Sequence, residues 1–417
     1  MAALNGTVGA FYTSKIKALE LDISDDYVTV TDPSSGVLDM GNNPNMSFEI
    51  WANISDGSNG VVLSKGGVAS AGYRAEISDS VFSFGVIDDT STFARARSTS
   101  DVANDRWMHL TAVVSDHAGN QISIRNYVNG IADGSNLFAS GSTFNFANAS
   151  DLIIGDKGAV SPTRRIGMVR MWNKALSATQ ISDLHDGGFP VNSKNNVIGE
   201  WWFHEGRGTT VIDSSGQGND GTISGSTWVT TTYDTVTAET LGTANGSLTE
   251  FSTDFPNVDN DNLTVTVDGT AQVLGDDFKM TPKGTITFHT APASGSVVAT
   301  YRHYPMTLEA GGVTGWSLDW TAEALDTTDF LSSGAREFIS GLRTWTATAE
   351  RHWVNKMAVP MVTEKVILKL FHDEPNDAYY NGWAIVTGLH PSVAVEGLVD
   401  ETLDFQGTSF LGVETTR

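Results

Sequence analysis

Two carboxylates near the start of the chain have a spacing that could serve sugar hydrolysis. Glycoside hydrolases hold two carboxyl groups across the scissile bond, and alternate residues of a β-strand project from the same face. Glu20 and Asp22 alternate in this way, but Ser24 takes the next position on their face, where a further carboxylate would be needed. Glu200 and Glu205 flank an aromatic cluster, where packing explains them better. We therefore expect these four carboxylates to be structural.

Other catalytic and metal-binding motifs are absent from the sequence. The nine histidines show no metal-ligand spacing on a helix, and the chain has no cysteine, so disulfides and thiol chemistry are excluded. No Gly-Lys-Ser/Thr phosphate loop occurs, and Ser214 does not lie in a Gly-x-Ser-x-Gly elbow. His109 falls in an alternating pattern and is expected to be a half-buried strand residue. The sequence therefore predicts a protein without enzymatic activity.

The composition favours an all-β protein built from several domains. The chain has 417 residues, 42 of them glycine and only 11 proline, and short alternating segments recur with turn residues between them. Apolar residues follow a helical period only near residues 177–184 and 335–342. No apolar run approaches the roughly 18 residues that a membrane-spanning helix needs. The elements that could position any site are therefore strands and the loops that join them.

Residues 17–232 are predicted to form a β-sandwich of many short strands. Alternating segments such as residues 46–51 and 107–114 are separated by Asn- or Asp-rich turns. This part of the chain resembles the laminin-G-like, concanavalin-A-like jelly roll, which implies a short helix at residues 178–185. The resemblance is carried by residues 48–51, 106–110, 127–130, 153–155, 170–177, 200–203 and 213–222.

Laminin-G-like domains often hold one Ca²⁺ at the rim of the sandwich, which makes acidic residues in tight turns candidate ligands. Asp156, Asp213 and Asp220 are such residues. The alternative is that each makes an Asx turn, and the absence of EF-hand ligand spacing favours this interpretation. Calcium is therefore the only cofactor that the resemblance suggests.

Sugar binding is the other use of a jelly roll, because sugars stack on exposed aromatic rings. Tyr73 and Phe93 lie outside the family motifs and are the freer candidates. Five tryptophans fall inside those motifs and are expected to be buried, namely Trp51, Trp107, Trp172, Trp201 and Trp202.

Residues 233–305 are predicted to form a smaller β module. Alternating runs and a last strand at residues 297–301 surround the hairpin signal Asp268-Gly269. The module resembles an immunoglobulin-like domain that is common in virus tail and appendage proteins. Residues 241–251, 276–278 and 290–293 carry this resemblance.

Residues 315–350 are predicted to form a strand, a short helix and a second strand. The helix would cover residues 335–342, with Ser333 as its cap and Gly341 as its stop. This stretch resembles the signature of the major tail tube proteins of long-tailed, siphovirus-like viruses. The signature residues are Trp316, Leu318, Asp319, Asp326, Phe330, Arg336, Glu337, Phe338, Leu342 and Trp345.

The tail tube resemblance implies a domain formed by residues 306–417, a β-sandwich or barrel with one helix, completed by residues 1–16 as its first strand. Copies of the chain would form stacked hexameric rings of a tube that conducts viral DNA, with the jelly roll and the small module on the outside. The implied partners are the protein itself, the tape measure, terminator and distal tail proteins, and host glycans. The implied location is the virion tail after assembly in the host cytoplasm.

The charge of the chain opposes binding to nucleic acid. With 25 basic and 49 acidic residues, the net charge is −24, and a protein that grips DNA needs the opposite balance. One interpretation is solubility or a saline origin. The other is that acidic residues line the lumen and let DNA slide. The candidates are Asp319, Glu323, Asp326, Asp329 and Glu350.

Two other functions compete with the tail tube. A tail fibre or adhesin would use residues 17–232 to bind carbohydrate, and a glycan-cleaving enzyme would use the same jelly roll for hydrolysis. Rings or tubes in electron micrographs would indicate the tube, monomers or trimers the lectin, and release of reducing sugar the enzyme.

Overall fold

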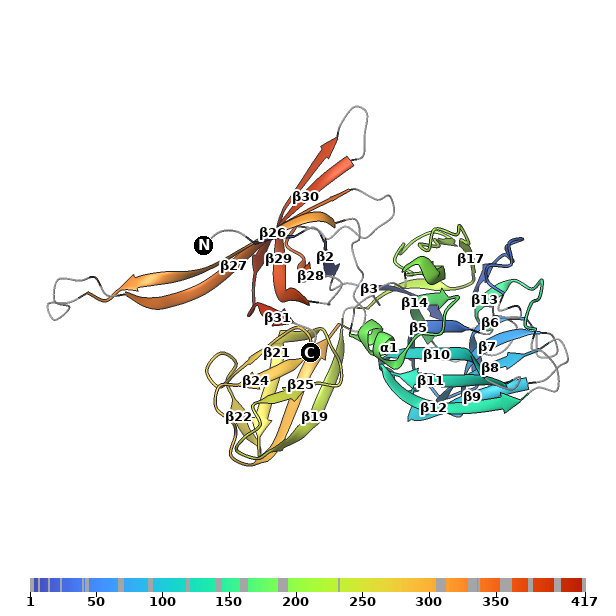
Figure 1. The fold of residues 1–417 in the computed structure, drawn as a ribbon, viewed down its shortest axis with the longest axis horizontal. Coiled ribbons are helices and arrows are strands. Elements are labelled where there is room, and N and C mark those ends of the chain that lie inside the picture. Colours follow the sequence, from blue (N-terminus) through green and yellow to red (C-terminus); the bar gives the residue numbers. More distant parts are fainter. Residues whose placement is uncertain are drawn as a thin grey trace. The chain divides into compact units, whose positions relative to one another are not determined.

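The protein consists almost entirely of β-strands arranged in two compact units (Figure 1). The computed structural model describes residues 4–6, 8–13, 16–22, 25–39, 41, 45–66, 71–88, 93–117, 121–139, 145–157, 164–186, 194–231, 233–304, 313–328, 336, 338–352, 362–373, 378–393 and 399–414. One unit is Lys15–Asp234, and the other combines Met1–Ser14 with Thr235–Arg417. The all-β prediction is confirmed. None of the helices in the described ranges has the length and apolar character needed to cross a membrane.

Two large antiparallel sheets make up the unit Lys15–Asp234. The order of the first is β12 (Ile131–Ala139), β11 (Gln121–Val128), β10 (Trp107–His117), β5 (Met46–Ile54), β14 (Arg164–Trp172), β3 (Ile16–Leu21) and β18 (Thr227–Thr231), and β15 (Val197–Trp201) also pairs with β14. The order of the second is β16 (Thr210–Val211), β17 (Gly221–Ser224), β4 (Tyr27–Val30), β13 (Leu152–Gly155), β6 (Gly60–Lys65), β7 (Gly72–Ser78), β8 (Val81–Ile87) and β9 (Phe93–Asp101).

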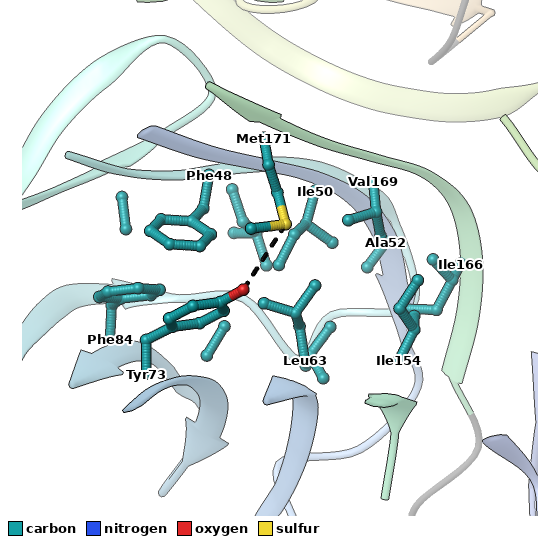
Figure 2. Close-up of a cluster of buried hydrophobic side chains, with 14 of the residues drawn as sticks. Phe48, Ile50, Ala52, Leu63, Tyr73, Phe84, Ile154, Ile166, Val169 and Met171 are labelled. Atoms are coloured by element: carbon teal, nitrogen blue, oxygen red, sulfur yellow. Dashed lines mark hydrogen bonds between the residues drawn. The ribbon is translucent and has the colours of Figure 1, made fainter. Parts of the chain in front are cut away.

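The jelly roll encloses one continuous apolar core. Phe48, Ile50 and Ala52 occupy alternate positions of β5 and are all buried in this core. Figure 2 shows them packed with Tyr73, whose hydroxyl lies 4.0 Å from the Met171 sulfur. Each large apolar side chain buried in this way contributes about 1.5–3 kcal/mol to stability. Strands alone therefore give this unit a core of its own.

The one α-helix described, α1 (Ala178–His185), lies where the sequence predicts it. The Ser177 hydroxyl accepts the Gln180 amide proton at 3.2 Å, and the Gln180 side chain accepts the Ser177 amide proton at 3.0 Å. This capping box satisfies amides that the first helical turn leaves open. Ile181 and Leu184 are buried with Trp172 in a second apolar cluster. A 3-10 turn, η1 (Lys194–Asn196), precedes β15.

The small module has two facing sheets and its own core. Phe251, Phe278 and Tyr301 are among its buried residues. The first sheet has the order β19 (Asp234–Ala244), β25 (Gly295–His303), β21 (Val258–Val267) and β22 (Thr270–Gln272). The second has the order β20 (Glu250–Ser252), β24 (Thr285–Phe288) and β23 (Phe278–Met280).

The remaining sheet joins the two ends of the chain. Its order is β1 (Leu4–Gly6), β26 (Val313–Asp326), β27 (Phe338–His352), β30 (Val399–Gly407), β29 (Ala378–Val393), β28 (Lys365–Asp373) and β2 (Val8–Thr13), with β31 (Gly412–Glu414) also on β29. β1 pairs with β26, and β2 pairs with β28. Because β1 and β2 are consecutive in sequence, one N-terminal segment covers both edges of this terminal sheet.

The predicted helix at residues 335–342 is wrong where the structure describes it. Phe338 begins β27, and Ile339 pairs with Leu325 of β26. A two-turn helix is marginal in water, whereas an extended segment pairs with the backbone of β26. The ends of β26 and β27 form a long hairpin (Figure 1), and we call residues 322–326 with 338–343 the arm. Ala335 lies outside the described residues.

The small module packs against the terminal sheet within their common unit. The Trp383 indole N–H donates to the Val258 carbonyl at 2.8 Å. The Lys365 ammonium lies 2.6 Å from an Asp259 oxygen and 2.7 Å from an Asp261 oxygen. These contacts join β29 and β28 of the sheet to β21 of the module.

Candidate functional site

A polar pocket lies at the rim of the jelly roll, where two loops meet. β4 and β17 are antiparallel neighbours, and Val30 pairs with Gly221, so the loop after β4 lies beside the loop before β17. The pocket has a volume of about 360 Å³. We call it the rim pocket, and it is lined by Thr31, Asp32, Pro33, Ser34, Ser35, Gln217, Gly218, Asn219 and Asp220.

The loop before β17 is held rigidly by Asp213. One carboxylate oxygen of this buried side chain accepts the amide protons of Glu200 at 3.0 Å and Ser215 at 2.9 Å. The other oxygen accepts the Asn219 amide proton at 2.9 Å. Asp220 accepts the Asp213 amide proton at 2.9 Å through one oxygen and is itself exposed. Asp213 therefore shapes the loop, while Asp220 presents a carboxylate to the rim pocket.

The other wall of the rim pocket rests on a buried lysine. The Lys65 ammonium is surrounded by oxygen atoms, and we call this arrangement the Lys65 cage. Its neighbours are Asp32 Oδ1 at 2.7 Å, Ser150 O at 2.8 Å, Asp39 Oδ1 at 2.9 Å, Asn148 O at 3.0 Å and Asn148 Oδ1 at 3.4 Å. A buried ammonium is tolerated only when it is paired and hydrogen-bonded. The cage therefore fixes Asp32 in place at the edge of the pocket.

The rim pocket is equipped for hydrogen bonding. Hydroxyls of Ser34 and Ser35, the Gln217 amide and the carboxylates of Asp32 and Asp220 line a space within the 300–1,000 Å³ typical of ligand sites. Sequence analysis identified Asp220 but missed the loop at residues 31–35. The Pro-Ser-Ser-Gly run after an alternating strand was a turn signal that could have found it.

The three calcium candidates do not form one cluster. Asp213 and Asp220 share a turn, whereas Asp156 accepts the Val61 amide proton at 3.1 Å and lies near the Arg164 guanidinium. In the described ranges, no group of three or more His, Asp or Glu side chains is placed to hold a metal ion. The hydrogen bonds made by Asp213 are those of a turn-forming residue.

The paired carboxylates near the N-terminus are held by a structural partner. Glu20 lies 2.7 Å from the Arg165 guanidinium, on a pair of neighbouring strands. A hydrogen bond with Asp26, together with slight desolvation and the charge of Asp26, raises the pKa of the exposed Asp22. Glu205 accepts the Ile212 amide proton at 2.8 Å.

A buried charge network lies on the face of β5 that is covered by α1. Glu49 is 3.1 Å from the His109 Nε2 and 3.1 Å from the Arg170 guanidinium, which is also 2.6 Å from Glu200. Burial alone would raise the pKa of Glu49, but Arg170 and His109 outweigh it and lower the pKa. Burial also lowers the pKa of His109, against the opposing effect of Glu49. His109 is fully buried here, more deeply than predicted, and the network faces protein rather than solvent.

The aromatic candidates for sugar stacking divide in two. Tyr73 is buried, and its hydroxyl donates to the Leu38 carbonyl at 2.9 Å, so this prediction is wrong. Phe93 is 51% exposed on β9 and remains a candidate. Trp202 is half-buried, with the Arg170 guanidinium 5.1 Å from its ring centre. Four tryptophans are buried as expected, namely Trp51, Trp107, Trp172 and Trp201.

The tail tube signature is split between core and surface. Trp316, Leu318 and Trp345 are buried in the terminal sheet. Phe338 and Leu342 lie exposed on the arm. The other described members, Asp319, Asp326 and Arg336, are exposed, as are Glu323 and Glu350, while Phe330, Glu337 and Asp329 lie outside the described residues.

Two parts of the chain match known families. Residues 22–182 match the family described as "Concanavalin A-like lectin/glucanases superfamily", which agrees with the jelly-roll resemblance. Residues 230–309 match the family described as "Phage T7 tail fibre protein, N-terminal domain". The second match covers the small module and associates the chain with phage tails. The tail tube itself stays a prediction, and the matches favour the tail fibre alternative.

Solved structures resemble the chain only distantly. The heptameric SAP-like pentraxin from Limulus polyphemus is 15% identical over 40% of this chain and 85% of its own, with a TM-score of 0.28. The binding domain of botulinum neurotoxin serotype G is 11% identical over 97% of this chain and 88% of its own, with a TM-score of 0.35. The binding domain of Paraclostridial Mosquitocidal Protein 1 is 9% identical over 96% and 87%, with a TM-score of 0.36. No curated protein matches the chain. Likenesses this distant carry no functional argument.

Proposed function

We propose that the protein is a tail fibre or adhesin-type component of a phage tail, and that its jelly roll binds host-surface glycans at the rim pocket. The observation that carries this proposal is the pocket of about 360 Å³, which is lined mainly by polar side chains. The match of residues 230–309 to a tail fibre domain supports the tail location. Assembly in the host cytoplasm and association with other tail proteins belong to the same proposal.

The fixed geometry of the pocket suits a ligand rich in hydroxyl groups. Asp213 holds one loop through three amide protons, and Lys65 holds Asp32 on the other side. A site that is rigid before binding loses less entropy when the ligand arrives. The free oxygen of Asp220 accepts a sugar hydroxyl proton, and Gln217 both donates and accepts.

The proposal is one of binding without cleavage. Glycoside hydrolysis requires two carboxyl groups with different protonation states across one bond. Asp32 forms an ion pair with the Lys65 ammonium, so Asp220 is the one carboxylate in the lining of the rim pocket that makes no ion pair among the described residues. Release of reducing sugar from bacterial polysaccharides is therefore expected to stay at background.

Glycan-array binding followed by calorimetry tests the proposal. The full chain should bind at least one bacterial surface polysaccharide, and Asp220→Ala should weaken that binding about tenfold, since the hydrogen bonds of a charged acceptor are lost. Asp116→Ala removes an exposed acid elsewhere on the jelly roll and is the matched control. Absence of binding across the array, or equal binding by both variants, would overturn the assignment.

The tail tube remains a second candidate because of one specific observation. One N-terminal segment pairs with both edges of the terminal sheet, while the arm stays exposed for contact with other subunits. In this function, exposed acids such as Asp319 and Glu350 would face DNA in the lumen. Negative-stain micrographs of the purified chain should then show rings or tubes, and reversing these acids to lysine should slow genome ejection.

A further inference from the structure

A cleft lined by two cationic side chains lies within the unit that holds the small module and the terminal sheet. Its volume is about 490 Å³, and Leu274, Met280 and Phe410 supply apolar walls. Lys279 and Arg343 also line it, from β23 of the module and β27 of the sheet. We call this the basic cleft. Its mixture of apolar walls and cations fits a ligand that combines an apolar group with an acid.

The cations of the basic cleft stand out in a strongly acidic chain. Neither Lys279 nor Arg343 has a carboxylate partner among the described residues, and the Lys279 ammonium instead lies 4.9 Å from the centre of the Phe410 ring. His289 also lines the cleft, with its Nδ1 2.9 Å from the Asp276 carbonyl oxygen. The chain has 49 acids for 25 bases, yet this cleft brings two of the bases together. The positive charge of the cleft therefore favours the binding of a carboxylate.

The arm presents the complementary chemistry. Leu325, Phe338, Ile339 and Leu342 are 42%, 54%, 56% and 79% exposed on a two-stranded ribbon. Such a ribbon buries little apolar surface by itself and gains stability from a partner. Asp326, next to Leu325, is exposed, and hydrogen bonds from Thr328 lower its pKa, so its carboxylate is ionised at neutral pH.

Arg343, at the base of the arm, lines the cleft of its own molecule, but Asp326 near the far end of the arm does not reach it. Arg343 pairs with Ala322, and Asp326 lies four residues further along the same strand. At about 3.3 Å per residue, this places Asp326 roughly 13 Å from the position opposite Arg343, toward the tip. An Asp326 side chain that pairs with Arg343 in the cleft must therefore come from another molecule.

We propose that the arm of a second copy of this chain seats in the basic cleft. Phe338 of that copy, which lies opposite Asp326 on the same face of the ribbon, packs against the apolar walls, and its Asp326 pairs with Lys279 and Arg343. Because the arm and the cleft are different patches of one chain, the contact is heterologous and propagates into a ring or a filament. This contact does not depend on glycan binding at the rim pocket, so the two proposals fail separately.

A charge-swap experiment on the full chain tests this contact. In sedimentation velocity at low salt, the wild-type chain should self-associate with increasing concentration. Lys279→Glu and Asp326→Lys should each weaken association about tenfold or more, because each places like charges together. The chain that carries both substitutions should regain part of the association, since the lysine at position 326 then meets the glutamate at position 279 while Arg343 stays in the cleft. Glu350→Lys changes the net charge as Asp326→Lys does, away from the arm, and should leave association unchanged.

Three outcomes would overturn the inference. One is a wild-type chain that stays monomeric at every concentration reached. Another is a double variant that melts like the wild type yet fails to regain association. The third is an equal loss with Glu350→Lys, because that result would assign the effect to overall charge.

Discussion

Lys65 of the jelly roll and Lys279 of the small module are both strand lysines, but their surroundings are opposite. Lys65 is fully buried among four oxygen-bearing partners that include two carboxylates. Lys279 is partly exposed and touches an aromatic ring instead of an acid. A fully enclosed cation has no capacity left for a ligand, whereas an open one does. The comparison teaches that the buried lysine paired with carboxylates stabilises the fold, whereas the open lysine beside an aromatic ring keeps its charge available for a ligand.

The largest expected effect is loss of the Lys65 cage. Lys65→Ala leaves Asp32 and Asp39 without their cation, and breaking a buried pair in this way costs about 3–5 kcal/mol. Denaturant unfolding of the variant measures this loss. Lys17, which donates to the Thr230 hydroxyl at 2.6 Å in an exposed position, is the control, and Lys17→Ala should change stability by less than about 0.5 kcal/mol. Equal losses in both variants would break the comparison.

Addition of calcium tests whether the oxygens around Lys65 are already occupied by its ammonium. The oxygens around Lys65 are the kind that hard cations prefer, but in the wild-type chain the ammonium occupies their centre. Adding Ca²⁺ or a chelator should therefore leave the melting temperature of the wild-type chain unchanged. In Lys65→Ala, Ca²⁺ should raise the melting temperature by binding the native state. A calcium response in the wild-type chain would instead point to a separate site.

The charge network under α1 should give the next largest effect. Glu49→Gln removes the carboxylate that pairs Arg170 with His109, and the expected loss is about 2–3 kcal/mol. Since the pKa of Glu49 is lowered in the fold, its ionised form adds stability above pH 4.5 that is lost as pH falls through the folded pKa. Unfolding curves between pH 3 and 7 should show this acid-sensitive part in the wild type only. Glu76, paired with the half-exposed Arg74, is the control, and Glu76→Gln should cost less than about 1 kcal/mol.

The pKa of Asp234 is shifted in the opposite direction from that of Glu49, because its neighbours do not outweigh the effect of burial. Burial raises the pKa of this acid from 3.8 to about 6, although the Trp107 amide donates to it at 2.7 Å. An acid whose pKa is raised in the fold lowers the free energy of unfolding at a pH where it is ionised in both the folded and the unfolded state. The free energy of unfolding should therefore rise as pH falls from about 6 to 3.8. Asp234→Asn keeps an acceptor for Trp107 and should add about 1–2 kcal/mol at pH 8. An unchanged free energy of unfolding of Asp234→Asn at pH 8 would contradict this prediction.

The smallest effect on stability is expected at Lys279. Lys279→Ala removes an open cation that closes no ion pair among the described residues, so the free energy of unfolding should change by less than about 0.5 kcal/mol. A large destabilisation would show that the basic cleft is part of the core, and the comparison with Lys65 would fail.

The sequence predicted elements whose signals are local and missed those decided by distant partners. The period at residues 177–184 and the jelly-roll resemblance predicted α1, and the capping box that starts this helix lies within a few residues of sequence. Residues 335–342 have similar apolar spacing, yet Phe338 and Ile339 lie in a β-strand because they pair with β26. The Lys65 cage was missed for the same reason. Its oxygens come from positions 32, 39, 148 and 150, which only the folded sandwich brings together.

The sequence singled out part of the candidate site for a different reason. Asp213 and Asp220 were candidate calcium ligands in a tight turn; in the structure Asp220 lines the rim pocket, and Asp213 holds the loop beside it. Tyr73 was misjudged because a tyrosine in an alternating strand can face either side, and the register of β7 turns it into the core. The arm was missed because an exposed apolar strand imitates an amphipathic helix over a few residues.

The pairing of β1 and β2 with the terminal sheet sets an order of events during synthesis. These strands leave the ribosome before their partners β26 and β28, which follow more than three hundred residues later. The jelly roll contains all of its own strands and can fold while the N-terminal segment still waits. Contacts this distant in sequence slow the last step of folding. A nascent chain stalled before β28 would therefore display a finished jelly roll beside an unpaired leading strand.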